Sequence, residues 1–241
     1  TISFGAIVTP TAVPALSITL DYYEIDVTDA IDGIGSQVIL DQCLASGEAF
    51  FCDLINRGSG GTLWIGTDNI VNTDINTGYE KRSGVDLNVA YTLELDDYGS
   101  LEFSGVATQL INFETQPIAG GETNVCDGKW GGTCGAPNPD LVANFRAAWA
   151  SPYDLKLIAQ LRHVAGVDAD SGGRPNFGSQ NYVDLTALYD YKFLQIRWGA
   201  KNVFDKTAPV AGNPPEGNGN TYPGVYDAFG RFVFLGISAD F

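Results

Sequence analysis

Apolar and polar residues alternate along most of the chain, and this period of two is the pattern of β-strands. From Val85 to Leu95, aliphatic or aromatic residues occupy every odd position, and Asp, Asn, Ala, Thr or Glu occupies every even one. Segments of this kind are predicted to be strands over residues 1–8, 16–27, 83–95, 100–114, 141–150, 155–167, 181–191, 194–201 and 230–241. The fold class is therefore predicted to be all-β.

Short turns and long connections alternate between these strands. The turns at Asp96–Gly99, at Ser151–Asp154 and near Lys192 take only a few residues each. The long connections fall on the other side of the predicted antiparallel meander and cover about residues 28–78, 117–139, 168–180 and 206–225. Within the first of them, residues 36–44 are predicted to form a short helix. Small turns on one rim and large loops on the other are typical of a transmembrane β-barrel, in which the large loops are extracellular.

Each predicted strand has one apolar face and one polar face. The charged residues of the polar faces are Glu102, Arg146, Lys156, Arg162, Asp184, Arg197 and Lys201. In a wide barrel such residues face a wet lumen while the apolar faces contact lipid. A soluble β-sandwich has the same periodicity but buries its apolar faces in a core. The loop asymmetry and strands of about ten or more residues favour the barrel.

The segment from Gly230 to Phe241 keeps its alternation to the last residue, with Val233, Leu235, Ile237 and Phe241 on its apolar face. Chain ends usually fray as polar tails. We therefore expect this strand to pair on both sides and to face an apolar medium, as the closing strand of a barrel does. An amphipathic strand that closes a soluble sandwich is the alternative.

Composition narrows the class further. The apolar fraction is 44%, and no apolar run approaches the roughly 18 residues of a transmembrane helix, so a helical membrane protein is excluded. Because the chain starts at Thr1 and contains no Met, we expect a piece of a longer precursor, entered within a strand. The formal charge of −16 argues against nucleic-acid binding and against a polybasic membrane-surface protein.

The four cysteines fall as two close pairs, each inside a polar connection. Four cysteines allow three pairings, and the short separations favour the local disulfides Cys43–Cys52 and Cys126–Cys134. Disulfides in turn indicate an oxidising compartment. A zinc site is the alternative; the spacings do not match those of zinc knuckles, and the only histidine, His163, lies on a predicted strand.

Five stretches of sequence follow one another on these predicted strands and loops. They are LSITLDYYEIDVTDAI (Leu16–Ile31), QCLASGEAFFCDLINR (Gln42–Arg57), GYEKRSGVDLNVAY (Gly78–Tyr91), KNVFDKTAP (Lys201–Pro209) and YDAFGRFVFLGISADF (Tyr226–Phe241). In this order they resemble the C-terminal β-barrel part of TonB-dependent outer-membrane receptors, and the resemblance covers nearly the whole chain. It implies about nine strands of a barrel of about 22, with the plug domain and the earlier strands outside this sequence. Nine strands do not close by themselves, so we expect an unclosed sheet with two exposed edges.

The resemblance also implies a function and a location. A receptor of this kind lies in the outer membrane of a Gram-negative bacterium and imports a scarce, bulky ligand with energy relayed through TonB. The ligand would be a ferric siderophore, cobalamin or an oligosaccharide, and the TonB complex would act through the plug. The remaining partners are outer-membrane lipid and the outer-membrane assembly machinery, which is expected to recognise the terminal strand through Val233, Leu235, Ile237 and Phe241. A passive porin or a structural barrel is the alternative.

No catalytic site is expected, because no Ser or Cys motif accompanies His163. The chain is predicted not to be an enzyme and to need no cofactor or resident metal, although Asp168 and Asp170 could loosely hold Ca²⁺. Rigid aromatics, cations and amides of the long loops are the candidates for ligand binding. They are Trp64, Lys129, Trp130, Arg174, Asn176, Phe177 and Tyr222. Ordinary loop packing is the alternative role of each.

Overall fold

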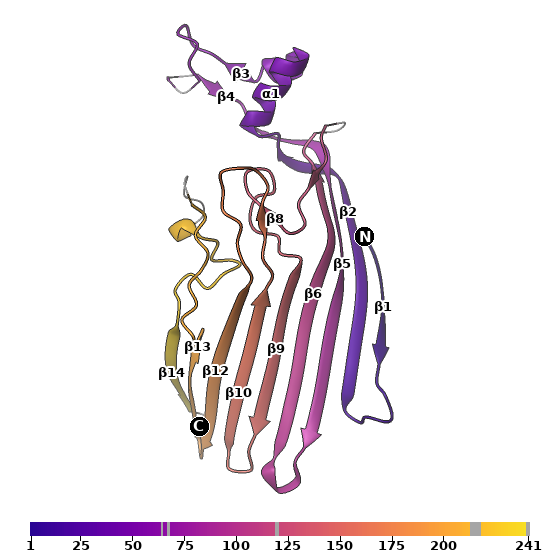
Figure 1. Cartoon of the computed structure of the whole chain (residues 1–241), viewed down its shortest axis with the longest axis vertical. Coiled ribbons are helices and arrows are strands. Elements are labelled where there is room, and N and C mark those ends of the chain that lie inside the picture. Colours follow the sequence, from indigo (N-terminus) through magenta and orange to yellow (C-terminus); the bar gives the residue numbers. More distant parts are fainter. Residues whose placement is uncertain (64, 67, 119–120, 213–217, 240–241) are drawn as a thin grey trace. The chain divides into compact units, whose positions relative to one another are not determined.

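The computed structural model describes residues 1–63, 65–66, 68–118, 121–212 and 218–239. Its main sheet is an antiparallel meander, drawn as adjacent arrows in Figure 1. The strands follow in the order β1 (Ile2–Val8), β2 (Leu16–Gly33), β5 (Asp74–Glu94), β6 (Ser100–Gln116), β9 (Leu141–Ala150), β10 (Leu155–Val164), β12 (Gln180–Tyr191), β13 (Leu194–Lys201) and β14 (Phe232–Ala239). The short strand β7 (Asn124–Val125) adds to β6. The predicted all-β meander of about nine strands is therefore confirmed.

Two strands extend beyond their predicted ends. Strand β2 continues to Gly33 and β5 begins at Asp74, so the connection predicted over residues 28–78 is shorter at both ends. The acidic residues near the end of β2 suggested a loop, but strand pairing satisfies backbone groups whatever the polarity of the side chains. Strand β10, by contrast, ends at Val164, three residues before its predicted end.

The sheet has two edges in the part of the chain that the structure describes. Strand β1 pairs there with β2 alone, and β14 with β13 alone. The predicted unclosed sheet is thus confirmed. Among the described helices, none has the length and apolar character needed to cross a membrane.

The strand registers place polar and apolar residues on opposite faces of the sheet. Gln160 pairs with Arg146 on one side and with Asp184 on the other, which forms a polar row across three strands. Leu157 pairs in the same way with Trp149 and Ala187, which forms an apolar row. Cross-strand neighbours share a face, so the predicted separation of the faces is confirmed.

The short turns use backbone conformations that few residues adopt. In the turn between β5 and β6, Asp96–Tyr98 forms a 3₁₀ turn and Gly99 has a φ of +87°. A Cβ on Gly99 would lie 1.9 Å from the carbonyl oxygen of Ala150, so only glycine fits there. This turn is the minimal turn that the sequence predicts.

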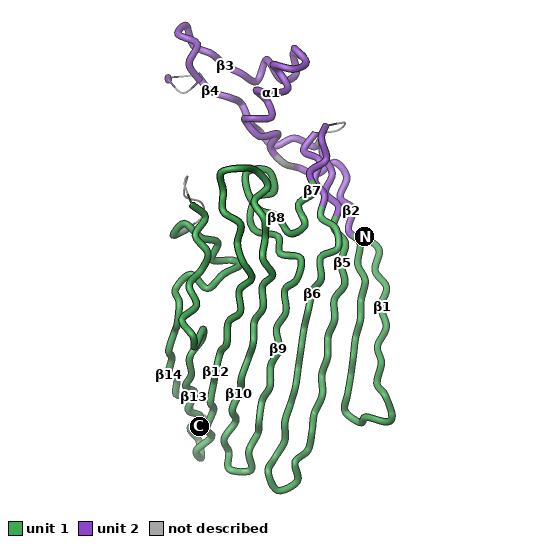
Figure 2. The backbone as a smooth tube through the Cα atoms, in the orientation of Figure 1, with its two compact units in different colours: residues 1–24, 82–113, 125–241 green, residues 25–81, 114–124 purple. Residues whose placement is uncertain are grey.

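The chain divides into two compact units, coloured green and purple in Figure 2. Unit 1 contains residues 1–24, 82–113 and 125–241, and unit 2 contains residues 25–81 and 114–124. Unit 2 holds helices α1 (Ser36–Ser46) and α2 (Ala49–Cys52) and the small hairpin of β3 (Ile55–Asn56) with β4 (Asn69–Ile70). Its own small core is built on Ile34, Ile39 and Phe51. The helix predicted over residues 36–44 is confirmed.

Candidate functional site

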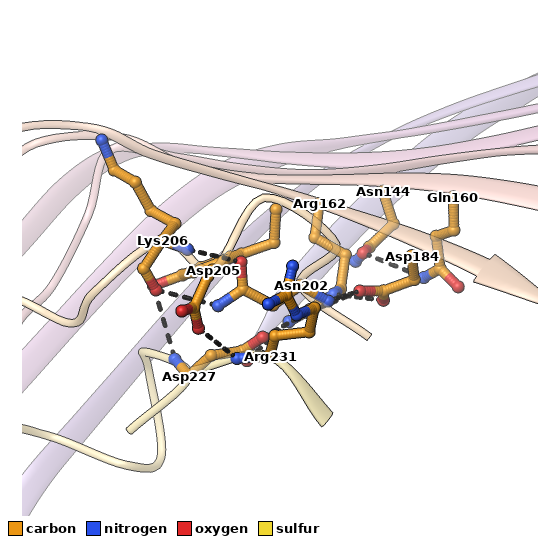
Figure 3. A network of polar contacts seen from close by, with 10 residues as sticks. Asn144, Gln160, Arg162, Asp184, Asn202, Asp205, Lys206, Asp227 and Arg231 are labelled. Atoms are coloured by element: carbon orange, nitrogen blue, oxygen red, sulfur yellow. Dashed lines mark hydrogen bonds and ion pairs between the residues drawn. The ribbon is translucent and has the colours of Figure 1, made fainter. Parts of the chain in front are cut away.

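The most connected polar group of unit 1 is centred on Arg162, on the polar face of β10 (Figure 3). Its Nε donates to Oδ2 of Asp184 on β12 at 2.8 Å. Its Nη1 and Nη2 donate to the two carboxylate oxygens of Asp227 at 2.8 and 2.5 Å. Asp227 precedes β14, so one guanidinium joins two strands of the barrel wall to the last long loop. Bidentate Arg–carboxylate pairs of this kind fix geometry as well as adding energy.

The same loop is held at its start by Asn202, which is 1% exposed. Its backbone N–H donates to Asp184 at 2.7 Å, and its side chain exchanges two hydrogen bonds with the backbone of Lys206. Asn202 has a φ of +50°, a conformation that asparagine tolerates better than most residues. Farther along, the backbone N–H of Arg231 donates to Asp205 at 2.7 Å. The stretch KNVFDKTAP is therefore a loop-anchoring element.

Other pairs continue the polar face of the sheet. The Nζ of Lys156 donates to Glu102 at 2.8 Å, across the intervening strand β9. The amides of Asn144 and Gln160 meet at 3.4 Å beside Arg162. The polar face thus presents amides and paired charges, together with the cation Arg146, which lies in register with Gln160.

Three long loops of unit 1 pack together in a loop core, made of the buried residues Trp130, Val164, Val167, Phe177, Ala211 and Tyr226. The rings of Trp130 and Phe177 stack with centroids 4.2 Å apart, and Tyr226 meets Phe177 edge-on. The indole N–H of Trp130 donates to the carbonyl of Pro175 at 3.1 Å. Strand β8 (Lys129–Trp130) also pairs with β11 (Asp168–Ala169). Burial, with a smaller contribution from Tyr182, raises the pKa of Tyr226 to about 12.

The loop core corrects part of the predicted binding surface. Trp130 is 0% exposed and Phe177 is 4% exposed, so neither presents a ring for a ligand. The sequence does not distinguish a loop aromatic that faces solvent from one that packs against a second loop. Tyr222 packs against the same core, with its ring edge-on to Trp130. Packing, the alternative role, applies to Trp130 and Phe177, whereas Tyr222 is only partly buried and its ligand-binding role stays a prediction.

The remaining candidates lie around the loop core or outside the described residues. The guanidinium of Arg174 lies 5.5 Å from the ring centroid of Trp130, and Asn176 accepts the backbone N–H of Ala169. Lys129 is half-buried on β8. Trp64 lies outside the residues that the structure describes. A ligand-binding role for these four residues stays a prediction.

The acidic residues of these loops serve the packing. Oδ2 of Asp170 accepts the backbone N–H groups of Thr133 and Cys134 at 2.7 and 2.8 Å. Burial, together with the charges of Asp127 and Asp168, raises the pKa of Asp140. Within the described ranges, no group of three or more His, Cys, Asp or Glu side chains could hold a metal ion.

Two grooves open on the apolar face of the sheet, with volumes of about 410 and 490 Å³. The grooves are lined by small residues, such as Gly105, Ala147 and Ala159, and by aromatic residues, such as Phe145 and Trp198. Their linings are mostly apolar, although Ser104, Arg146, Gln160 and Thr186 also border them, so they suit a polar ligand poorly. The polar face and its loops therefore form the candidate site.

Residues 3–203 match the family model described as TonB dependent receptor-like, beta-barrel. The chain belongs to the TonB-dependent receptor family. This family consists of β-barrels of the Gram-negative outer membrane, so the resemblance seen in the five sequence stretches is confirmed. None of the curated proteins matches the chain.

Solved receptors share the fold. A mutant of the ferric enterobactin receptor PfeA from Pseudomonas aeruginosa matches 99% of this chain with a TM-score of 0.62 and 17% identity. The iron transporter FrpB from Neisseria meningitidis matches 98% of it at 0.55 and 13% identity, and the copper transporter OprC matches 99% at 0.57 and 14% identity. This chain spans about 30% of the length of each. All three names denote receptors or transporters and none an enzyme.

The disulfides follow the predicted local pairing, Cys43–Cys52 in unit 2 and Cys126–Cys134 beside the loop core. On β14, Val233, Leu235 and Ile237 are exposed on one face, whereas Phe241 lies outside the described residues. The role of Asp227, which lies 65 residues from Arg162, was not predicted from the sequence. Its one available signal was its position inside the family-like stretch YDAFGRF.

Proposed function

We propose that this chain is the C-terminal barrel part of a receptor that imports a scarce, bulky ligand with energy relayed by TonB. The ligand classes are a ferric siderophore, cobalamin and an oligosaccharide. The observation that supports this function best is the family match together with three long loops packed into one core, the last of which Arg162 ties to the polar face of the sheet. Loops that are already ordered by their own packing suit capture of a large ligand better than free passage of small solutes.

The remaining assignments belong to the same proposal. The four long connections are extracellular, and TonB contacts a plug domain encoded outside this sequence. The exposed apolar residues Val233, Leu235 and Ile237, with Phe241, form the signal that the outer-membrane assembly machinery reads by strand addition. Outer-membrane lipid covers the apolar face of the sheet.

The test is uptake by cells that carry the full-length gene, compared with cells from which it is deleted. Radiolabelled ferric siderophores, cobalamin and oligosaccharides are offered one at a time. Uptake that requires both the gene and TonB supports the proposal. Uptake that requires the gene but persists without TonB identifies a passive porin instead, and unchanged uptake of every compound in the deletion strain contradicts both.

A further inference from the structure

Unit 2 and the long loops of unit 1 are both acidic, and the charge is unevenly distributed along the chain. Unit 2 has eleven acidic residues against two basic ones, a formal charge of −9 out of the −16 of the whole chain. The long loops of unit 1, residues 125–140, 165–180 and 202–231, add seven acidic residues against four basic ones. Each unit is therefore negative by itself.

Three arginines near the loop core, Arg162, Arg174 and Arg231, are already committed to neighbours. Arg162 is shared between Asp184 and Asp227, so this group has one positive and two negative charges. The guanidinium of Arg174 lies over Trp130, and that of Arg231 donates to the carbonyl of Val203 at 3.3 Å. A cation that is already paired cannot neutralise an incoming anion without giving up its partner.

We infer that the receptor takes a neutral or cationic ligand and discriminates against polyanionic chelates. A cleft with one sign of charge lowers the local concentration of ligands of the same sign and slows their association. The amides of Asn144 and Gln160 on the polar face suit uncharged groups, because an amide both donates and accepts hydrogen bonds. This inference rests on the proposed function and narrows its ligand to a metal cation, an uncharged or cationic chelate, cobalamin or a neutral sugar.

The test compares two ferric probes that differ mainly in charge. A ferric tris-catecholate is trianionic and a ferric tris-hydroxamate is uncharged. Binding to the purified full-length receptor is followed by tryptophan fluorescence at about 20 and about 500 mM NaCl. We expect the uncharged probe to bind at least about tenfold more tightly, and binding of the trianion to strengthen as salt screens the repulsion. Tighter binding of the trianion, weakened by salt, overturns the inference.

A charge variant of unit 2 supplies a matched comparison. Three exposed carboxylates are neutralised in the variant Asp41→Asn, Glu48→Gln, Asp53→Asn. The control changes three exposed neutral positions, Ser36→Ala, Ala45→Ser and Ser59→Ala. The charge variant should speed association of the trianion several-fold and leave the uncharged probe unchanged, whereas the control should change neither. Equal rates for the trianion in both variants contradict the inference.

Cellular uptake separates failure of this inference from failure of the proposed function. The deletion strain carrying the full-length gene is offered the two ferric chelates, Cu²⁺, cobalamin, a neutral oligosaccharide and a ferric polycarboxylate. TonB-dependent uptake confined to neutral and cationic compounds supports the inference. Uptake of a polyanion overturns it but leaves the proposed function standing, and no gene-dependent uptake of any compound overturns both.

Discussion

Replacing Trp130 by alanine tests whether the loop core holds the three long loops together. Trp130 is fully buried, stacks on Phe177 and donates to Pro175. Deleting a buried Trp side chain lowers stability by about 3–5 kcal/mol. The lost indole hydrogen bond accounts for about 1 kcal/mol of this total. Because these contacts join loops rather than barrel strands, we expect local opening of the loops and not loss of the barrel.

Hydrogen exchange of the full-length receptor measures that opening directly. Beside the loop core, the backbones of Val167 and Phe177 form two hydrogen bonds with each other, of 2.9 and 2.8 Å. Peptides that cover these two residues therefore report on opening of the loops. At 1.36 kcal/mol per factor of ten, the smallest expected loss corresponds to exchange roughly 100-fold faster. Peptides from the middle of β9 and β10 should keep their protection.

Two variants control this measurement. Phe229→Ala removes a ring that is 95% exposed, and it should leave exchange unchanged. Tyr226→Phe removes a buried hydroxyl that has no hydrogen-bond partner among the described residues, so it should be neutral or slow the exchange. If Trp130→Ala and Phe229→Ala have the same small effect, the loop core does not hold the loops. Weaker ligand binding with unchanged exchange would instead restore Trp130 as a direct ligand contact.

Three further predictions concern the sheet faces, unit 2 and pH. Leu87→Lys, on the apolar face, should lower the free energy of unfolding by about 2–4 kcal/mol if the site is near the bilayer midplane, and Asn88→Lys should be mild; equal losses in urea titrations of folded barrel would contradict the assignment of faces. Replacing Cys43 and Cys52 by serine should lower the stability of unit 2 by about 2–3 kcal/mol. Hydrogen exchange should then be faster in unit 2 and unchanged in β9, and undiminished protection of α1 would refute this prediction. The raised pKa of Asp140 means that the folded loops bind more protons than the unfolded ones. The contribution of Asp140 to loop stability should therefore be fully present below the ordinary carboxyl pKa and be lost as pH rises through the folded value. Asp140→Asn should abolish this contribution in hydrogen exchange measured against pH.

Much of the barrel wall follows from the period-two pattern, because each strand must present one apolar and one polar face. The alternation from Val85 to Leu95 needs no knowledge of its neighbours to be recognised. The extra length of β2 was not predictable in the same way, since pairing with a partner strand decides where its acidic end stays extended. Strand ends depend on backbone hydrogen bonds between distant segments, which local composition does not encode.

The candidate site was predictable in its residue types and not in its contacts. The sequence places Arg162 and Asp184 on the polar face, and the register confirms that they occupy neighbouring strands. Their third partner, Asp227, comes from a loop whose path no periodicity describes. The same limit explains Trp130 and Phe177, which were predicted as a binding surface because aromatic loop residues suit both binding and packing.

The loop core changes how ligand affinity should be understood in this chain. A long loop without internal contacts would have to be ordered each time a ligand binds, at an entropic cost of about 1–2 kcal/mol per residue fixed. Here the packing around Trp130 and the ion pairs of Arg162 order the loops before any ligand arrives. Binding can then use its free energy for the ligand contacts themselves. The residues of the loop core are therefore expected to control ligand affinity without touching the ligand.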